Sequence, residues 1–237
     1  MFPERRRALL EVLVCSGYPT QLVLALVLRL AGVIPMDDSG RLSASFVFAL
    51  SMLDAIVLMS LVLYFLRRSG QSPTALFLGS RSVPRELGLG VLLLPLTFGL
   101  VFGLLGLVHA VAPDLRNVPQ NPLEALLATR AGFIALIAVA LVAGGLREEL
   151  QRAFLLHRFE HHLGGRTIGL VVTSVGFGLG HTLQGWDAAI ATGALGFLWG
   201  ALYMARRSTV APIVNHALFN GTELIGAFAR LQSMADV

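Results

Sequence analysis

Residues 128–157 read ATRAGFIALIAVALVAGGLREELQRAFLLH, an apolar run that ends in a cluster of charged side chains. An α-helix needs about twenty apolar residues to cross the roughly 30 Å hydrocarbon core of a bilayer. The run is too long and continuous for a barrel strand, so we interpret it as a transmembrane helix. Its charges would then lie at membrane depth, where ionisable groups are costly and are usually retained for function.

Similar apolar runs recur along nearly the whole chain. Of its 237 residues, 55% are hydrophobic and only 14% are charged, against roughly 25% charged in an ordinary soluble domain. The runs cover residues 9–34, 43–66, 87–112, 128–157, 167–185, 187–205 and 209–230. We therefore expect an all-α protein, a polytopic transmembrane helical bundle of about seven helices, with six to eight as the range. The longest breaks between these runs, residues 67–86 and 113–127, do not resemble domain linkers. We therefore expect one integral membrane domain over 1–237.

Charged residues alternate in type from one loop to the next. Every one of the 18 basic residues is arginine, and arginines occupy every second loop, at Arg5–Arg7, Arg67, Arg68, Arg81, Arg85, Arg158, Arg166, Arg206 and Arg207. The loops between them carry acidic residues such as Asp37, Asp38 and Asp187. Because cytoplasmic loops are enriched in basic residues, we expect a bacterial cytoplasmic membrane protein with its N-terminus inside. No basic face is left for nucleic acid, so the lipid bilayer is the expected environment.

Polar residues of the second half of the chain pair at helical spacing, three or four residues apart. The pairs are Glu148/Glu149 with Arg152, Phe177 with His181, and His216 with Asn220. A carboxylate and two imidazoles from three helices could converge on one water molecule. That water could be deprotonated by glutamate directly, or could first bind a metal held by the imidazoles. Residues of about 144–222 are therefore the expected catalytic core.

Two other features of the apolar runs need an interpretation. Asp54 is central in its predicted helix, and we favour a polar contact between helices over participation in a site. Gly176 with Gly180, and Gly196 with Gly200, have the four-residue spacing that lets membrane helices approach closely. The single Cys15 excludes an intrachain disulfide and a cysteine metal cluster.

Three motifs occur in order on three apolar runs: REELQRAFLL at 147–156, FGLGH at 177–181 and APIVNHALFN at 211–220. Together they resemble the CPBP family of intramembrane proteases, which includes the CAAX-processing Rce1 type and bacterial homologues linked to bacteriocin immunity. The stretch LGFLWGALYMARRSTVAP at 195–212 also resembles the glycine-rich helix and basic turn before the family's last motif.

The resemblance implies roles for the matching residues. Glu148 would be the general base that activates water, and His181 its partner. His216 with Asn220 would bind metal or stabilise the developing oxyanion, while Glu149 and Arg152 would support the site. The family is usually classed as metalloproteases, which implies Zn²⁺ or another divalent metal on His181, His216 and Glu148. The same residues are equally sufficient for catalysis without a metal.

The spacing of the first motif departs from the family pattern. The family has three residues between the glutamate pair and the arginine, whereas two lie between Glu149 and Arg152. Alignment on the arginine would put Arg147 in the place of the first glutamate. We prefer alignment on the doublet because Arg147 cannot accept a proton. Both Glu148 and Glu149 stay candidates for the base, with Glu148 preferred.

These observations predict an intramembrane endopeptidase that hydrolyses peptide bonds with glutamate-activated water. Its substrate would be a peptide or protein, and a prenylated CAAX peptide is the choice by analogy with one branch of the family. A proton-coupled transporter would use the same polar residues to move ions. An immunity or scaffold protein would use them only for binding.

Overall fold

The structure is a computed structural model that describes residues 2–36 and 40–235, and over these residues it consists of helices and short turns. Asp37 and Asp38, used above for topology, lie outside the described residues. The helices are α1 (Phe2–Val14), α2 (Tyr18–Leu30), α3 (Ala44–Arg68), α4 (Pro73–Phe77), α5 (Val83–Leu92), α6 (Leu94–Val111), α7 (Arg130–Val139), α8 (Glu149–His162), α9 (Arg166–Leu179), α10 (Trp186–Arg206) and α11 (Val210–Ala235). The π-helical segment η3 (Ala140–Glu148) joins α7 to α8 without a break, and η1 (Pro113–Leu115), η2 (Glu124–Ala128) and η4 (Thr182–Gln184) are 3₁₀ turns.

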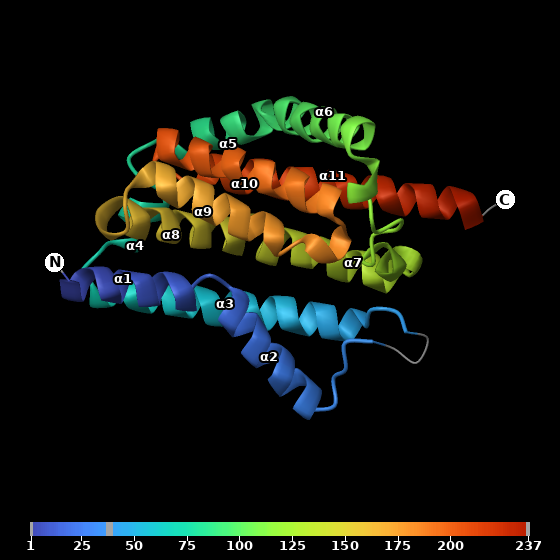
Figure 1. The fold of residues 1–237 in the computed structure, drawn as a ribbon, viewed down its shortest axis with the longest axis horizontal. Helices are drawn as coiled ribbons and strands as arrows, with labels where there is room; N and C mark the ends of the chain where they lie inside the picture. The colour runs from blue at the N-terminus through green and yellow to red at the C-terminus, as the bar shows by residue number, and fades with distance from the viewer. Residues whose placement is uncertain (1, 37–39, 236–237) are drawn as a thin grey trace.

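The helices form a bundle in which α8–α11 lie between two outer groups (Figure 1). On one side, α3 packs against α2, α7, η3 and α8; on the other, α5 and α6 pack against α11. Helix α10 packs against α9, α6, α8 and α11, and α11 also contacts η3. This places η3 and the start of α8 between α3 and α11, so their charged side chains face other helices rather than lipid.

Four helical stretches of the described residues are long and apolar enough to span a membrane: Ala44–Arg68, Val83–Val111, Arg130–His162 and Trp186–Arg206. A fifth span results if the bent pair α1–α2 is counted as one. The expected count of about seven is therefore not confirmed. Helix α9 is only 14 residues long, and the polar residues Asn215, His216 and Asn220 interrupt the apolar sequence of α11. Helices α9 and α11 are therefore not among the four stretches, whereas the charged stretch Arg130–His162 is.

The run 9–34 is not one straight helix, contrary to expectation. It breaks between α1 and α2, which are bent by 43°. Gly17 has a φ of 92°, and Pro19 stands in the first turn of α2. A left-handed glycine ends a helix readily, and a proline in the first turn starts the next, so the sequence at the break explains it.

Two further boundaries differ from the predicted ones. The run 87–112 is divided at Leu93 between α5 and α6, where Pro95 begins the second helix. The run 167–185 ends early: α9 stops at Leu179, and Gly185 with a φ of 116° precedes α10. His181 consequently lies in the turn after α9, although the spacing had predicted it inside the helix.

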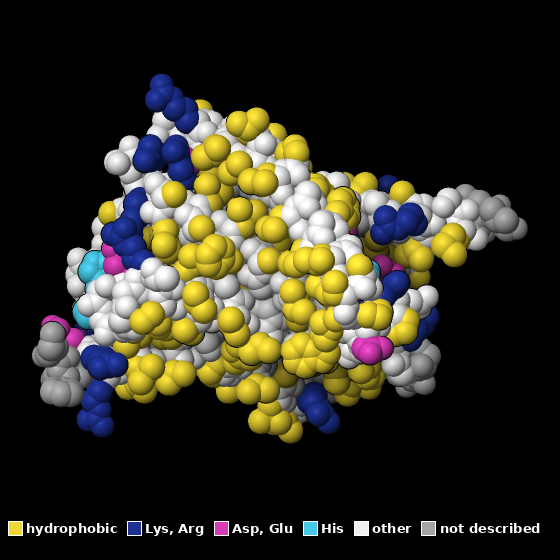
Figure 2. All heavy atoms as spheres, turned by 45° about the horizontal axis from the view of Figure 1, so that its top comes forward, with side chains coloured by type: hydrophobic (Ala, Val, Ile, Leu, Met, Phe, Trp, Pro, Cys, Tyr) yellow, Lys and Arg dark blue, Asp and Glu magenta, His cyan; other side chains and the backbone are white. Residues whose placement is uncertain are grey.

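The arginine-rich loops lie together at one end of the bundle. Arg7 at the N-terminal end donates to Ser69 after α3, and Arg81 donates to the carbonyl of Arg206 at the end of α10. Glu160 near the end of α8 bridges Arg166 and Arg207, and this carboxylate raises the pKa of Arg207. Side chains of arginine gather densely at that end in Figure 2, while hydrophobic side chains cover the middle of the face. Apolar cover between charged ends is what an integral membrane protein presents to a bilayer.

Glycines let α9 and α10 approach at specific points. A Cβ added at Gly178 would lie 2.5 Å from the carbonyl oxygen of Ala189, whereas one added at Gly176 would meet no atom within 4 Å. On α10, added Cβ atoms at Gly196 and Gly200 would meet side chains at 2.9 and 2.5 Å. The predicted pair on α10 therefore marks close packing at both positions. In the pair Gly176/Gly180, a Cβ added at Gly180 would come no closer than 3.4 Å to another atom, so the close approach of α9 to α10 is at Gly178 instead.

Replacing Gly178 by alanine should destabilise the protein by about 1–3 kcal/mol, because the new methyl group must push the backbone of α10 away. The measurement is thermal or denaturant unfolding in detergent micelles. Gly176→Ala is the matched control, two residues away on the same helix, and we expect it to stay within about 0.5 kcal/mol. Equal effects of the two substitutions would contradict the observed packing.

Candidate active site

A buried carboxylate at the start of α8 joins two helices of the bundle. Glu149 accepts hydrogen bonds from Nε and Nη2 of Arg152, both at 3.2 Å, and its Oε1 lies 2.9 Å from Nδ1 of His216 on α11. The side chains of Glu149, Arg152 and His216 are 1%, 4% and 3% exposed. A buried carboxylate is stable only when its charge and lone pairs are matched. Glu149 is matched on both sides and acts as the structural link between α8 and α11.

Aromatic rings fix the orientation of His216 and Arg152. The ring of Trp199 stacks on His216 with centroids 3.7 Å apart, and the guanidinium of Arg152 lies 4.4 Å from the centroid of Phe177. Trp199 is itself held by a 2.8 Å hydrogen bond from Nε1 to Asn215. Because Nδ1 of His216 faces an ionised carboxylate, it carries the proton in the neutral ring, and Nε2 is left as an acceptor.

The other glutamate of the doublet has a different environment. Oε2 of Glu148 lies 3.8 Å from Nε2 of His216, and Oε1 lies 3.7 Å from Nη1 of Arg147. Both distances exceed those of a hydrogen bond. The side chain of Glu148 is 18% exposed, whereas that of Glu149 is 1% exposed. Among the described residues, therefore, Glu148 has ion-pair neighbours but no hydrogen-bond partner, and it keeps contact with open space.

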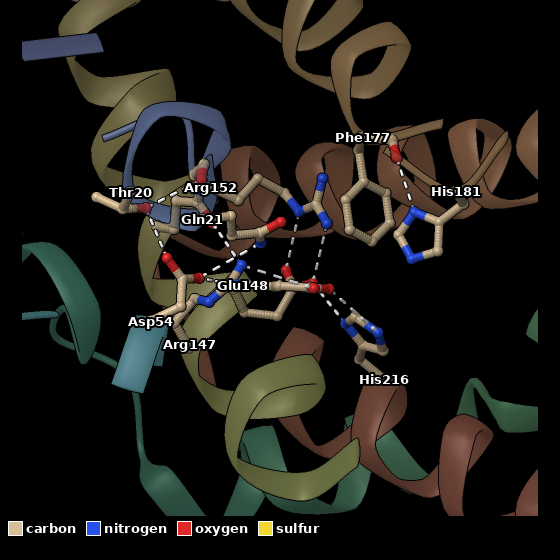
Figure 3. Close-up of polar contacts among 12 residues, drawn as sticks. Thr20, Gln21, Asp54, Arg147, Glu148, Arg152, Phe177, His181 and His216 are labelled. Atoms are coloured by element: carbon tan, nitrogen blue, oxygen red, sulfur yellow. Dashed lines mark hydrogen bonds and ion pairs between the residues drawn. The ribbon is translucent and has the colours of Figure 1, made fainter. Parts of the chain in front are cut away.

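That space is a cavity of about 360 Å³ between the α1–α2 break, α8 and α9. Glu148, Arg147, Gln151, Arg152 and His181 supply polar lining, and much of the remaining wall is apolar, with Val12, Leu13, Leu155, Phe159, Val172 and Phe177. Figure 3 shows the Glu148 carboxylate between Arg147 on one side and His216 on the other, with Phe177 and His181 beyond Arg152. Glu149 does not line this cavity.

His181 reaches the cavity from the turn after α9. Its Nδ1 lies 2.8 Å from the carbonyl of Phe177, so Nδ1 carries the proton and Nε2 is an acceptor. The ring centroid of Phe177 is 4.9 Å from that of His181 and 6.2 Å from that of His216. The ring of Phe177 is therefore a neighbour of both histidines.

Asn220 lies one helical turn after His216 and faces η3. A Cβ added at Gly144 would come within 2.8 Å of Nδ2 of Asn220 and 4.0 Å of Nε2 of His216. The absence of a side chain at Gly144 thus lets both residues approach the segment that carries Glu148. All six residues predicted for the site, Glu148, Glu149, Arg152, His181, His216 and Asn220, lie on η3, the adjoining α8, the turn after α9 and α11. Of these, Glu148, Arg152 and His181 line the cavity, whereas Glu149, His216 and Asn220 do not.

Residues 129–222 match the family model described as type II CAAX prenyl endopeptidase Rce1-like. This segment is Rce1-like. It extends from the N-cap of α7 into α11 and contains all six predicted site residues together with the motifs at 147–156, 177–181 and 211–220. The match covers less than half of the chain and supports, at the level of the family, a CAAX-type intramembrane protease. No match was found among curated proteins or among solved structures.

Sequence reasoning assigned no role in the site to several residues of the Rce1-like segment and its surroundings. Arg147 was considered only as an alternative in alignment, yet it lies beside Glu148 and pairs with the buried Asp54 on α3. The preferred interpretation of Asp54, a polar contact between helices, is confirmed. Gln151 accepts a 3.1 Å hydrogen bond from Arg147, and Trp199 orients His216. A central aspartate in an apolar run was the available signal for this network.

The metal expected on His181, His216 and Glu148 does not fit the side chains as they are placed. Among the residues that the structure describes, no three His, Cys, Asp or Glu side chains converge on a position that could hold an ion. We therefore derive no catalytic step through a metal, and Zn²⁺ stays a prediction of the family resemblance.

Proposed function

We propose that the protein is an intramembrane endopeptidase in which Glu148 activates the hydrolytic water. The observation that carries this proposal is the contrast within the doublet. Glu149 is saturated by Arg152 and His216, whereas Glu148 lines the cavity without a hydrogen-bond partner among the described residues. A general base must reach both water and substrate, and of the two carboxylates only Glu148 meets that condition.

The proposed reaction needs only groups of this chain and water. Glu148 takes a proton from a water molecule, and an acceptor nitrogen of His216 or His181 orients the same water. The water oxygen attacks the carbonyl carbon of the scissile bond, which leaves a negative charge on the carbonyl oxygen. Collapse of this intermediate breaks the C–N bond, and the proton on Glu148 passes to the leaving amine. One carboxylate and one amine result.

The amide of Asn220 is our candidate donor to the oxyanion. It supplies N–H groups at the face of η3, one turn from His216. Electrostatic help of this kind is strong where bulk water is excluded, as it is inside a membrane bundle. Arg152 is too firmly engaged with Glu149 to turn towards the substrate, so we assign it to the support of His216 and Glu149.

The family suggests a prenylated peptide ending in a CAAX sequence as the substrate. The cavity supports this choice, because its carboxylate and histidine lie beside the apolar side chains Val12, Leu13, Leu155 and Phe159. A peptide bond could be presented to the polar part of the cavity while an attached lipid stays against apolar side chains or the bilayer.

The test is hydrolysis by the purified protein, reconstituted in liposomes, of a synthetic CAAX peptide with a farnesylated cysteine. We expect mass spectrometry to detect cleavage after the modified cysteine and, in H₂¹⁸O, one ¹⁸O in the new carboxyl group. The same peptide without the lipid should be cleaved at least about tenfold more slowly, because burial of the apolar chain is lost. Absence of any hydrolysis, together with proton flux in the same liposomes, would favour a transporter instead.

A further inference from the structure

Asp54 is a fully buried acid outside the Rce1-like segment. It lies near the middle of α3 and is 0% exposed. Thr20 and Gln21 of α2 donate hydrogen bonds to its two oxygens, and the guanidinium of Arg147 forms an ion pair with it. A carboxylate at this depth is retained only at a cost, which prompts the question of what it does for the adjacent site.

Arg147 is held by residues other than Glu148. Its Nη2 contacts Asp54, and its Nη1 donates to Oε1 of Gln151 at 3.1 Å. Gln151 is fixed in turn by a 2.8 Å hydrogen bond from Nε2 to the carbonyl of Cys15 in the α1–α2 break. The Nε of Arg147 has no hydrogen-bond partner among the described residues. The orientation of this guanidinium is therefore set by Asp54 and Gln151.

An arginine next to a glutamate in a poorly hydrated site would normally bind it. Such pairs form two parallel hydrogen bonds of about 2.7–2.9 Å, which occupy both carboxylate oxygens. Here Nη1 of Arg147 stays 3.7 Å from Oε1 of Glu148, outside hydrogen-bond distance. Asp54 competes with Glu148 for the guanidinium of Arg147. Asp54 binds it because this carboxylate is fully buried and, among the described residues, Arg147 is the cation that it contacts.

We propose that Asp54 is a positioning residue that restrains Arg147, so that the Glu148 carboxylate stays free to receive water. This inference rests on the proposed role of Glu148 as the base. It assigns a function to the α1–α2 break and the first turn of α2 as well, since the carbonyl of Cys15, Thr20 and Gln21 complete the restraint. Figure 3 shows the arrangement, with Thr20, Gln21 and Asp54 on one side of Arg147 and Glu148 on the other.

The first test is Asp54→Asn, assayed for peptide hydrolysis in liposomes. Released from its partner, Arg147 should turn onto Glu148, so kcat should fall about 10²-fold, the loss expected when a catalytic group is misplaced by about an ångström. KM should not change, because substrate contacts are intact. Asp187→Asn is the matched control: it removes another buried acid, paired with His109 and outside the cavity, and should leave kcat unchanged.

The second test is the double variant Asp54→Asn/Arg147→Gln, which removes both charges and the competitor for Glu148. We expect its kcat to exceed that of Asp54→Asn by at least tenfold. A folded double variant that is as inactive as the single variant would overturn the inference, and so would an Asp54→Asn variant with the kcat of the unmodified protein. If Asp54→Asn does not fold, the double variant decides alone, because a folded protein with less than a hundredth of the original kcat would show a separate need for Asp54.

Glu148→Gln in the same assay separates this inference from the proposed function. If Glu148→Gln is inactive and Asp54→Asn is fully active, only the role of Asp54 is lost. If Glu148→Gln retains activity, Glu148 is not the general base. The proposed mechanism is then wrong, and so is the inferred role of Asp54, which depends on it.

Discussion

Glu148→Gln is expected to lower kcat for peptide hydrolysis by about 10²–10⁴-fold, the contribution usually made by a general base. The amide has nearly the same shape but cannot accept the proton of water. Because Glu148 has no hydrogen-bond partner among the described residues and is 18% exposed, the thermal stability of the variant should be unchanged. The measurement pairs the hydrolysis assay with an unfolding curve.

Glu149→Gln provides the matched control because it makes the same change one residue away. This variant leaves Arg152 without its counter-charge and replaces one of the two acceptor oxygens by an NH₂ group, which cannot accept from Arg152 or His216, so we expect a marked loss of stability. Glu148→Gln should therefore lower kcat and leave stability unchanged, whereas Glu149→Gln should lower stability. A stable, inactive Glu149→Gln beside an active Glu148→Gln would reverse the assignment of the base.

Arg152→Met is expected to cause the second large effect, a decrease in the free energy of unfolding. The substitution leaves Glu149 buried with an uncompensated charge, a change that typically costs 3–5 kcal/mol at a buried pair. Denaturant unfolding in mixed micelles measures it. Arg152→Met/Glu149→Gln should recover part of the loss, because no unpaired charge remains.

Arg166→Met controls for the removal of an arginine as such. Arg166 pairs with Glu160 at the charged end of the bundle, but its side chain is 51% exposed. An exposed pair contributes about 0–1 kcal/mol, so the control should be nearly neutral. If Arg152→Met were equally mild, the buried link between α8 and α11 would not contribute to stability as described.

Helix positions and part of the grouping of the candidate site residues were predictable from the sequence because both depend on local patterns. Apolar runs locate the helices, and residues four apart share a face, which placed His216 beside Asn220 on α11. Glu148, His181 and Arg152 do line one cavity. The order of the three motifs was enough to predict the family to which residues 129–222 are matched.

The remaining features depend on contacts between distant segments. The number of spans was not predictable from apolarity, since α11 carries the polar residues of the site and α9 is short. The choice between Glu148 and Glu149 depends on which side of η3 meets α11, and the partner of Asp54 depends on the packing of α3 against η3. Gly17 and Gly185 mark the helix breaks before α2 and after His181. The prediction missed these breaks because it was based on the continuous apolar runs.

The π-helical geometry of η3 has a consequence for how three neighbouring charges share their tasks. Successive residues of a π-helix are rotated by roughly 80°, rather than the 100° of an α-helix, and the wider turn ends at Glu148. Arg147 thus turns to α3, Glu148 to the cavity and Glu149 to α11. The position of each residue around the helix matters as well as its identity. Loss of one residue upstream would rotate the three side chains by about a quarter turn around the helix axis, so that a different carboxylate would face the cavity. The number of residues in η3 before Glu148 therefore determines which carboxylate can act as the base.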